Sequence, residues 1–425
     1  MKILIAGGGW SGVASAIQAA KMGAETILVE RTDMLLGTGL VGGIMRNNGR
    51  FTATEELIAM GASEIFTAID GNYLHSDIDF PGHDHASLYN VATMEPIIRR
   101  LLEKAGVELR FETRLTDVKM SDKTIKAVVC KQKGEKAPLT ITADGFIDTT
   151  GTAGPAANCN KYGNGCAMCV LRCHSFGGRV SLAAKAGVDE MIGEKNGQRG
   201  AFSGSCKLLK ESLDPELVDT LNNRGVAVVP IPQDKQITGK LSIKACQQYA
   251  LPEFENNIVL LDTGHAKLMT PYFPLASLRL IPGFENARYE DPYAGGIGNS
   301  IRYVGMSPRD DSLKVDGVDN LFCGGEKAGL LVGHTEAICT GTLAAYNAVR
   351  QVRGESPLIL ADTTVIGDAI AQVRQQMQTP LGMGLKFTFS GSVLFERMKQ
   401  REMYTTDPGI IRERVHTAEL SDVFA

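Results

Sequence analysis

Three glycines and one glutamate near the start of the chain have the types and the spacing that bind a nucleotide. Gly7, Gly9 and Gly12 form a Gly-x-Gly-x-x-Gly turn, and Glu30 follows about twenty residues later. Gly7 permits the tight turn, Gly9 lets the backbone approach a pyrophosphate, and Gly12 lets a helix pack closely on a strand. The glutamate is placed to accept hydrogen bonds from a ribose hydroxyl group. The pattern predicts a bound ADP-containing dinucleotide, either FAD or NAD.

Four cysteines within one short stretch form a second group of residues that could bind a metal or carry out redox chemistry. Cys159, Cys166, Cys169 and Cys173 have the spacing C-x6-C-x2-C-x3-C. Thiolates brought together by short loops are typical ligands of a [4Fe–4S] cluster. We therefore predict such a cluster, close enough to a bound redox cofactor for electron transfer.

Three other interpretations of these cysteines stay open. Cys166, Cys169 and Cys173 fall at i, i+3 and i+7, which is the spacing of one buried helix face. A zinc ion uses similar spacing, with His174 as an alternative ligand. Cys166 and Cys169 also have the spacing of a dithiol that exchanges electrons with a flavin.

The elements around the glycine turn are those that a Rossmann-like fold needs. The apolar run 2–6 predicts a buried parallel strand, residues 13–22 an alanine-rich helix, and residues 26–29 the next strand. The helix would then present its free N–H groups and positive dipole end to the phosphates. The glycine-rich segment 35–49 predicts a packed loop that runs close to a ligand.

The strand and helix alternation is interrupted and later resumes. Residues 144–147 predict a short strand, and residues 321–323 predict another, followed by a glycine turn and a long helix over 334–352. Residues 155–315 lack this alternation and contain most of the prolines. Further elements are expected as helices over 54–69 and 94–104, strands over 107–111 and 124–129, and a mostly helical tail over 362–425 with breaks around Pro380 and Pro408.

Composition and charge narrow the class of protein. The chain has 425 residues, of which 44% are hydrophobic and 22% charged, as in an ordinary soluble enzyme. With 44 basic and 48 acidic residues the net charge is −4, so neither nucleic acid nor a membrane is expected as a partner. The first apolar run is too short for a signal peptide, and no run reaches about eighteen apolar residues. A cytoplasmic location follows, in which nine cysteines are expected as thiols, ligands or redox groups.

Four segments together resemble the FAD-dependent oxidoreductases of the glutathione-reductase-like superfamily. They are GGGWSG (7–12) with Glu30, TRLTDV (113–118), GFIDTTG (145–151) and NLFCGGEKAG (320–329). The resemblance implies that the second segment lies against the adenine and the third near the pyrophosphate. It also implies that Glu326, where Asp is commoner, binds the ribityl–phosphate portion of FAD.

The motifs and the resemblance together predict a set of FAD-binding residues. They are Gly7, Gly9, Ser11, Gly12, Glu30, Arg31, Gly39, Leu115, Gly151, Gly325, Glu326, Gly333 and Thr335. The predicted catalytic residue is His334, which would stabilise a reduced anionic flavin or move a proton. Simple packing, with Thr335 capping the helix, is the alternative role for this position.

Two later stretches resemble the glucose-inhibited division protein A group. They are LRLIPGFENARY (278–289) and GHTEAICTGTLAAYNAVR (333–350), whereas VERTDMLLGTGLVGG (29–43) is similar to general FAD-dependent oxidoreductases. The group includes a folate- and FAD-dependent tRNA uridine methyltransferase, which keeps a nucleophilic cysteine close to the flavin. This chain has no cysteine in residues 1–129. That departure and the acidic balance argue against methyl transfer.

Other residues carry weaker signals. His83, Asp84 and His85 lie in a polar PGHDH segment that is expected to be solvated, with catalysis or metal binding as the alternative. Three arginines are candidates for holding an anionic substrate, with a solvated position as the alternative: Arg279, Arg302 and Arg309. Cys323 and Cys339 are expected in the core, and Cys130, Cys206 and Cys246 have no informative spacing.

The expected fold is α/β: a Rossmann-like FAD-binding domain with an inserted α+β substrate domain and a helical C-terminal tail. The predicted boundaries are 1–155 for the first part of the FAD domain (with substrate-domain excursions around 50–95), 156–315 for the substrate or partner domain with the cysteines, 316–360 for the last part of the FAD domain, and 361–425 for the tail.

The expected function is that of an FAD-dependent oxidoreductase acting on a small-molecule substrate. Hydride or electron transfer at flavin N5 would be coupled through the cluster to an electron-carrier protein or partner subunit. The alternatives are a folate- and FAD-dependent enzyme that modifies tRNA, and a flavoprotein subunit of a redox complex.

Overall fold

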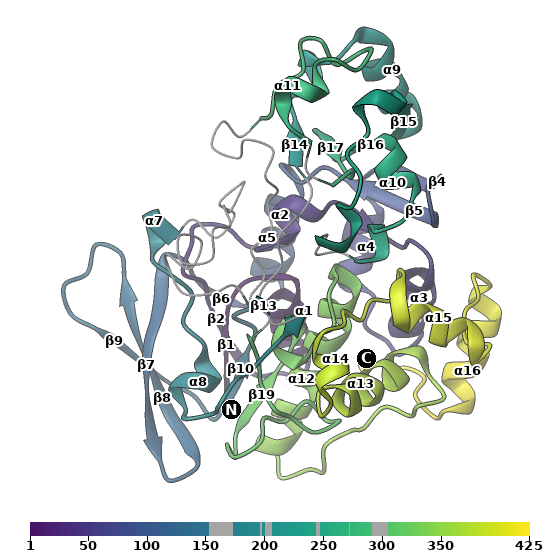
Figure 1. Cartoon of the computed structure of the whole chain (residues 1–425). Coiled ribbons are helices and arrows are strands. Elements are labelled where there is room, and N and C mark those ends of the chain that lie inside the picture. Colours follow the sequence, from purple (N-terminus) through teal and green to yellow (C-terminus); the bar gives the residue numbers. More distant parts are fainter. Residues whose placement is uncertain (153–172, 196–197, 200–205, 244–246, 272, 291–304) are drawn as a thin grey trace.

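Figure 1 shows the computed structural model of the chain. It describes all residues except 153–172, 196–197, 200–205, 244–246, 272 and 291–304.

A five-stranded parallel sheet forms the centre of the larger part of the molecule (Figure 1). Its strands lie in the order β19 (Leu321–Cys323), β10 (Gly145–Asp148), β1 (Lys2–Ala6), β2 (Glu25–Val29) and β6 (Glu108–Arg110). All four neighbouring pairs are parallel, and the three central strands are short apolar runs, as a sheet covered on both faces requires. Strands from both ends of the chain therefore build one sheet, and the predicted α/β Rossmann-like class is confirmed.

Two helices cover one region of this sheet and pack directly on each other. Helix α1 (Trp10–Lys21) begins straight after the glycine turn, three residues earlier than predicted, and α12 (His334–Val352) has the predicted bounds. A Cβ atom added to Gly341 of α12 would lie 2.2 Å from the Ser11 carbonyl oxygen, so only glycine permits this approach. The Ser15 hydroxyl donates to the Gly341 carbonyl at 2.9 Å.

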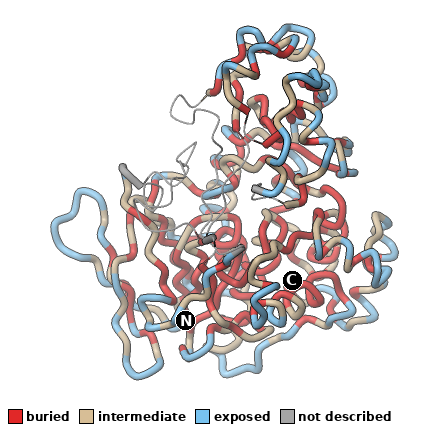
Figure 2. Tube along the Cα trace, viewed as in Figure 1, coloured by how far each residue is buried: buried red, intermediate tan, exposed pale blue. Residues whose placement is uncertain are grey.

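An antiparallel sheet at the top of Figure 1 belongs to the inserted segment. Its strands lie in the order β14 (Cys206–Leu208), β17 (Ala266–Leu268), β16 (Asn257–Asp262) and β15 (Val226–Pro230). Helices α9 (Pro215–Arg224), α10 (Glu253–Asn256) and α11 (Leu275–Leu278) accompany it. The sheet, α9 and α11 share a buried hydrophobic cluster that is separate from the cluster around the parallel sheet. Figure 2 shows buried segments in both parts of the molecule.

Two three-stranded antiparallel sheets also belong to the described residues. One joins β7 (Thr113–Ser121), β8 (Thr124–Gln132) and β9 (Leu139–Thr142). The other joins β3 (Ile44–Met45), β5 (His83–Tyr89) and β4 (Tyr73–Phe80). Short elements near the gaps in the described residues are α7 (Cys173–Phe176), α8 (Leu182–Lys185), β11 (Met191–Ile192), β12 (Glu194–Lys195), β13 (Gln198–Arg199) and β18 (Gly305–Met306). β11 pairs with β18, and β12 pairs with β13.

The C-terminal region is helical, as predicted. It contains α13 (Val365–Gln376), α14 (Pro380–Met383), α15 (Ser392–Gln400) and α16 (Pro408–Thr417). Pro380 and Pro408 each stand at the first position of a helix, where the missing N–H group is not needed. The two prolines thus mark helix starts.

Two local predictions were wrong. The helix expected over 54–69 is divided into α3 (Gly49–Ala59) and α4 (Glu64–Asp70), with a left-handed turn at Gly61 between them. The hairpin of β4 and β5 was not predicted, because three register shifts along this pair disturb the alternation of buried and exposed residues. Helix α5 (Met94–Lys104) has the predicted bounds. Among the helices described, none is long and apolar enough to span a membrane.

Candidate functional site

The glycine turn and Glu30 lie side by side at the ends of β1 and β2. The Glu30 carboxylate is buried and accepts hydrogen bonds from the Gly8 and Thr32 backbone N–H groups, each at 2.8 Å. Gly7 has φ +105°, and an added Cβ would lie 2.5 Å from the Thr149 carbonyl oxygen. No atom of the described residues lies within 4 Å of the corresponding Cβ position at Gly9. There is thus open space at the N-terminus of α1, where a pyrophosphate fits.

Two buried hydroxyl groups mark the first turns of α1 and α12. Ser11 Oγ and Thr335 Oγ1 have no hydrogen-bond partner within the described part of the chain. Buried hydroxyl groups normally have partners, so these two atoms indicate a polar group that would complete the site. An extended dinucleotide that runs from one helix N-terminus to the other fits both positions.

The segments that follow β10 and β19 come together because these strands are paired. The Gly324 N–H donates to the Asp148 carbonyl at 3.1 Å, and Thr152 Oγ1 donates to Glu326 Oε2 at 2.5 Å. An added Cβ at Gly324 would lie 2.4 Å from Ser11 Oγ. The glycine turn, the segment after β10 and the segment after β19 therefore form one cradle.

The remaining predicted FAD-binding residues lie around this cradle, with different contacts. Arg31 Nη1 donates to the Gly177 carbonyl at 2.6 Å, and Leu115 is a buried residue of β7. Gly39 begins the short helix α2 (Gly39–Gly42), and its carbonyl accepts a 2.7 Å hydrogen bond from the Tyr89 hydroxyl. Gly333 precedes α12, and an added Cβ would lie 1.9 Å from Glu336 Oε2. The binding roles of these residues remain predictions.

Three aromatic rings meet beside the cradle. The centroid of Trp10 lies 6.0 Å from that of Tyr89 and 6.1 Å from that of His334, and the last two are 6.2 Å apart. These rings come from the start of α1, the end of β5 and the start of α12. Sequence reasoning considered His334 alone, although the only tryptophan of the chain lies inside the glycine motif.

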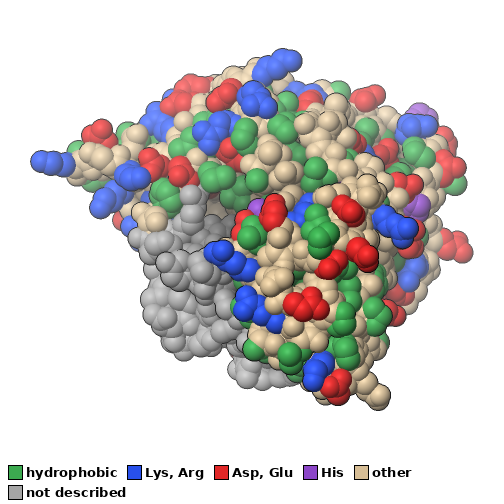
Figure 3. All heavy atoms as spheres, turned by 90° about the horizontal axis from the view of Figure 1, so that it is seen from above, with side chains coloured by type: hydrophobic (Ala, Val, Ile, Leu, Met, Phe, Trp, Pro, Cys, Tyr) green, Lys and Arg blue, Asp and Glu red, His purple; other side chains and the backbone are tan. Residues whose placement is uncertain are grey.

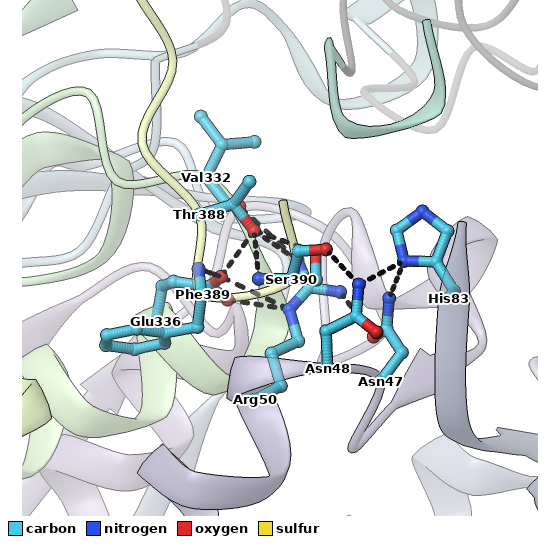
Figure 4. A network of polar contacts seen from close by, with 9 residues as sticks. All are labelled: Asn47, Asn48, Arg50, His83, Val332, Glu336, Thr388, Phe389 and Ser390. Carbon is cyan, nitrogen blue, oxygen red and sulfur yellow. Dashed lines mark hydrogen bonds and ion pairs between the residues drawn. The ribbon is translucent and has the colours of Figure 1, made fainter. Parts of the chain in front are cut away.

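A buried ion pair fixes the first turn of α12 (Figure 4). Arg50 Nε lies 3.2 Å from both Glu336 carboxylate oxygens, and both residues are almost fully buried. Burial opposes the charge on Arg50, but Glu336 raises the pKa of the guanidinium above its ordinary value. Thr388 Oγ1 and the Phe389 N–H donate to Glu336 Oε1 at 2.7 and 2.8 Å. The carboxylate thus has several partners from distant segments.

The same network continues to His83, which the sequence placed in a solvated loop. That prediction was wrong: His83 begins β5 and is 1% exposed. Its Nδ1 lies 2.9 Å from Asn47 Nδ2 and 3.3 Å from Asn48 Nδ2 (Figure 4). Its Nε2 lies 3.0 Å from the Gln248 carbonyl. Burial, and secondarily Arg50, lowers the pKa of His83 to about 3. The ring is therefore neutral, accepting at Nδ1 and donating at Nε2.

His85 differs from His83 in being partly exposed. Its Nδ1 lies 2.8 Å from Asp77 Oδ1 on the same hairpin.

A second buried charge cluster lies behind the cradle and was not predicted. Lys327, whose side chain is fully buried, contacts Glu190, lies 3.0 Å from Ser181 Oγ and lies 3.8 Å from Asp148 Oδ2. Burial lowers the pKa of Lys327 to about 8. Although burial works against ionisation, Lys327 and then Thr150 hold the pKa of Asp148 below its ordinary value. This cluster ties residues 181–190 to the ends of β10 and β19.

The predicted metal ligands Cys159, Cys166 and Cys169 lie outside the described residues, as does the side chain of Cys173. The part of the chain that was described contains no group of three or more His, Cys, Asp or Glu side chains able to hold a metal ion. The [4Fe–4S] cluster therefore has no support from the structure.

Four other cysteines are buried, as was expected for Cys323 and Cys339. They are Cys130, Cys206, Cys323 and Cys339. Burial raises the pKa of Cys130 to about 11, so this thiol is not activated. Arg302 and Cys246 lie outside the described residues.

Arg309 is neither a solvated residue nor a candidate substrate anchor. It is buried and donates to the carbonyls of Ala328 and Ile370 at 2.8 and 3.0 Å. Arg279 is exposed, and its Nε donates to the Ala287 carbonyl at 2.9 Å.

Two family models match separate parts of the chain. The model described as FAD dependent oxidoreductase matches residues 2–159, and the model described as Glucose inhibited division protein A matches residues 253–356. These regions contain the glycine turn and the start of α12, the two ends of the cradle.

Curated relatives match over short stretches. The tRNA uridine 5-carboxymethylaminomethyl modification enzyme MnmG of Clostridium novyi is 33% identical over 117 residues, or 27% of this chain and 17% of the relative. The methylenetetrahydrofolate–tRNA-(uracil-5-)-methyltransferase TrmFO of Moorella thermoacetica is 35% identical over 104 residues, or 24% of this chain and 23% of the relative. The matches thus span less than a quarter of either relative.

The fold extends beyond these stretches. The structure of Aquifex aeolicus GidA superimposes with a TM-score of 0.65 over 99% of this chain and 73% of the other, at 16% identity. The flavin-dependent monooxygenase PieE, solved with FAD and substrate, gives a TM-score of 0.52 over 99% and 72% of the two chains, at 13% identity. At these identities the likeness concerns the fold alone.

One expectation from composition needs correction. The net charge of −4 argued against nucleic acid as a partner, yet the matched relatives are by name enzymes that act on tRNA. Net charge describes the whole surface and does not exclude a local binding face, so the expectation was wrong. The matches, the glycine turn and the parallel sheet together support an FAD-dependent oxidoreductase fold related to the glucose-inhibited division protein A group.

Proposed function

We propose that the chain is an FAD-dependent enzyme that modifies a uridine base in tRNA. The observation that carries this proposal is the single cradle formed by the N-termini of α1 and α12, with Ser11 Oγ and Thr335 Oγ1 buried and without partners among the described residues. The two family models match the two sequence regions that build it. The tRNA substrate is inferred from the names of the curated relatives.

The residues of this chain have distinct roles in the proposal. The open space at Gly9 and the first N–H groups of α1 would receive the pyrophosphate, and Glu30 would hold the ribose. Thr335 and the N-terminus of α12 would face the pyrimidine end of the flavin, where positive potential stabilises negative charge. His334 would hold or move a proton beside that ring. When bound, FAD supplies hydride or electron transfer at N5.

The reaction we propose does not use a cysteine nucleophile from the N-terminal part. Residues 1–129 contain no cysteine, and the described cysteines elsewhere are buried. We therefore infer redox chemistry on the base, without methyl transfer through a thiolate near the flavin.

Exposed arginines on the inserted unit are candidates for the phosphate contacts. Three arginines of this unit are exposed: Arg224, Arg279 and Arg288. Arg279 donates a hydrogen bond to the carbonyl of Ala287, the residue before Arg288, and this bond holds Arg279 and Arg288 close together. Figure 3 shows Lys and Arg side chains interspersed with Asp and Glu on the face seen from above. A surface of mixed charge predicts modest affinity for tRNA, which depends on a few phosphate contacts.

The proposal is tested with the purified flavoprotein and an unmodified tRNA transcript. The transcript is incubated with protein, a reductant and either folate or none, and its nucleosides are then separated by chromatography and mass spectrometry. A modified uridine nucleoside that forms only when FAD is present supports the proposal. An unchanged transcript under all conditions, together with no tRNA binding, would contradict it.

A second candidate function rests on the cysteine spacing. Cys159, Cys166, Cys169 and Cys173 would hold a [4Fe–4S] cluster that exchanges single electrons with the flavin, in an oxidoreductase or a flavoprotein subunit. Anaerobic purification with iron and sulfide analysis decides this. About four irons per chain and broad absorption near 400 nm are expected. Flavin without iron or sulfide rules the cluster out.

A further inference from the structure

A short segment closes one side of the cradle. We call residues 35–43, which include α2, the strap. It starts beside the glycine turn, where the Leu36 N–H donates to the Gly8 carbonyl at 2.7 Å. It ends beside β5, where the Gly43 carbonyl accepts from the Tyr89 N–H at 3.0 Å. Gly37 and Thr38 are exposed, whereas Gly39 is buried, so the strap separates solvent from the interior.

The inner face of the strap is fitted to the aromatic rings of Trp10 and His334. A Cβ atom added to Gly39 would lie 2.4 Å from Trp10 Nε1, and one added to Gly42 would lie 1.7 Å from His334 Cε1. Glycine at these two positions lets the strap backbone rest directly on rings at the starts of α1 and α12. The strap therefore spans the two ends of the proposed FAD site.

The opposite side of the strap is held by the inserted antiparallel sheet. The Lys267 ammonium group of β17 donates to the Val41 carbonyl, and Lys267 is 5% exposed. Thr263, which lies between β16 and β17, accepts from the Val91 N–H at 3.1 Å and lies close to Gly43. A buried ammonium group makes strong, charge-assisted hydrogen bonds, because it has lost its water. One lysine thus links the inserted sheet to the middle of the strap.

We propose that Lys267 is a positioning residue that holds the strap closed over bound FAD and shields the flavin from solvent. This inference rests on the proposed FAD site. It assigns to the inserted sheet a direct role in the cofactor environment. Loss of the ammonium group would free the Val41 carbonyl and let the strap move away from the aromatic rings, while the phosphate contacts at the glycine turn stay intact.

The test compares the flavoprotein with Lys267→Met and the control Lys235→Met. Lys235 is on the same inserted unit but pairs with Asp234 at the surface. Quenching of flavin fluorescence by iodide reports solvent access, and FAD titration reports affinity. Lys267→Met is expected to raise the quenching constant at least threefold with FAD still bound, and Lys267→Arg to restore part of the shielding. Quenching equal to that of the wild type would overturn the inference.

A second variant keeps the test decisive if Lys267→Met does not fold. Gly42→Ala forces the strap away from His334, so it is expected to raise iodide access, and Gly42→Ala with His334→Ala is expected to lower it again. No rise in Gly42→Ala would overturn the inference. Absence of FAD from the wild-type protein would refute the proposed function itself, whereas bound FAD with unchanged quenching would refute only the role of Lys267.

Discussion

Arg50 and Glu336 form a buried ion pair between residues 286 positions apart in the chain, with Nε 3.2 Å from each carboxylate oxygen. It joins the start of α3 to the first turn of α12, beside the aromatic rings. The first turn of α12, one end of the proposed FAD cradle, is thus held by a buried ion pair as well as by the glycines around it.

Arg50→Ala is expected to destabilise the protein by about 3–5 kcal/mol, because it leaves the Glu336 carboxylate buried without its cation. Chemical denaturation followed by circular dichroism measures this change. Lys399→Ala is a matched control, since Lys399 and Glu396 are both exposed and lie 2.7 Å apart. A loss below about 1 kcal/mol, the usual value for a surface pair, would show that the buried pair is not important for stability.

His83 makes stability depend on pH. Its pKa is lowered to about 3 in the folded protein, whereas an unfolded histidine titrates near 6.5. Between these two pH values the unfolded state binds more protons than the folded state. The contribution of neutral His83 to the free energy of unfolding is therefore complete above pH 6.5 and is lost as the pH falls toward 3. The expected slope is about 1.4 kcal/mol per pH unit.

The histidine contribution is isolated with a variant pair. Denaturation of His83→Gln at pH 7 and pH 5 is expected to show a shallower pH dependence than that of the wild type. His85→Gln, at a partly exposed histidine of the same strand, is the control for loss of an imidazole. Equal slopes in His83→Gln and the wild type would contradict the assignment of His83 as a buried neutral group.

Ser11→Ala is expected to weaken FAD binding without weakening the fold. Loss of one hydrogen bond to a charged phosphate corresponds to about 1.5–3 kcal/mol, or roughly 10- to 150-fold in Kd. Stability without FAD is expected to stay the same or rise, because a buried hydroxyl group without a partner in the described structure is removed. Isothermal titration and denaturation measure the two effects.

Ser15→Ala is the matched control on the same helix. Ser15 donates to the Gly341 carbonyl, so the variant is expected to lose stability and to keep its FAD affinity near that of the wild type. If both serine variants bind FAD equally well, Ser11 does not contact the cofactor.

Removal of Arg279 and Arg288 together is expected to weaken tRNA binding and its dependence on salt. Each lost phosphate contact lowers the slope of log K against log salt by about 1. Filter binding of a tRNA transcript at several salt concentrations measures this slope. Lys123→Ala, at an exposed site between β7 and β8, serves as control. An unchanged slope in the double variant would place the RNA-binding face elsewhere.

The sequence predicted the elements whose local pattern is sufficient to define them. Strands β1, β2 and β10 are short apolar runs beside glycines, and α12 begins after a glycine and continues through small residues. Such signals come from neighbours in the chain. The parallel arrangement of these strands then follows from the crossover helix.

The site was predicted less completely, because its other contacts join distant segments. His83 is neutral chiefly because it is buried, and its partners come from distant segments: Asn47 and Asn48 share one turn, and Gln248 lies 165 positions away. No local pattern indicates these contacts. The contact of Lys267 with Val41 joins the inserted sheet to the strap across 226 positions. Long-range partners of this kind depend on the assembled fold.

Binding of FAD to the cradle is the central claim, and titration of the protein with FAD and with NAD tests it most directly. We predict one FAD per chain and no competing NAD binding for the wild type. We also predict no FAD binding for Gly12→Val, because a Cβ at Gly12 would lie 1.8 Å from the Gly7 carbonyl oxygen and open the turn. Binding of NAD in place of FAD, or equal FAD binding by a folded Gly12→Val variant, would contradict the account.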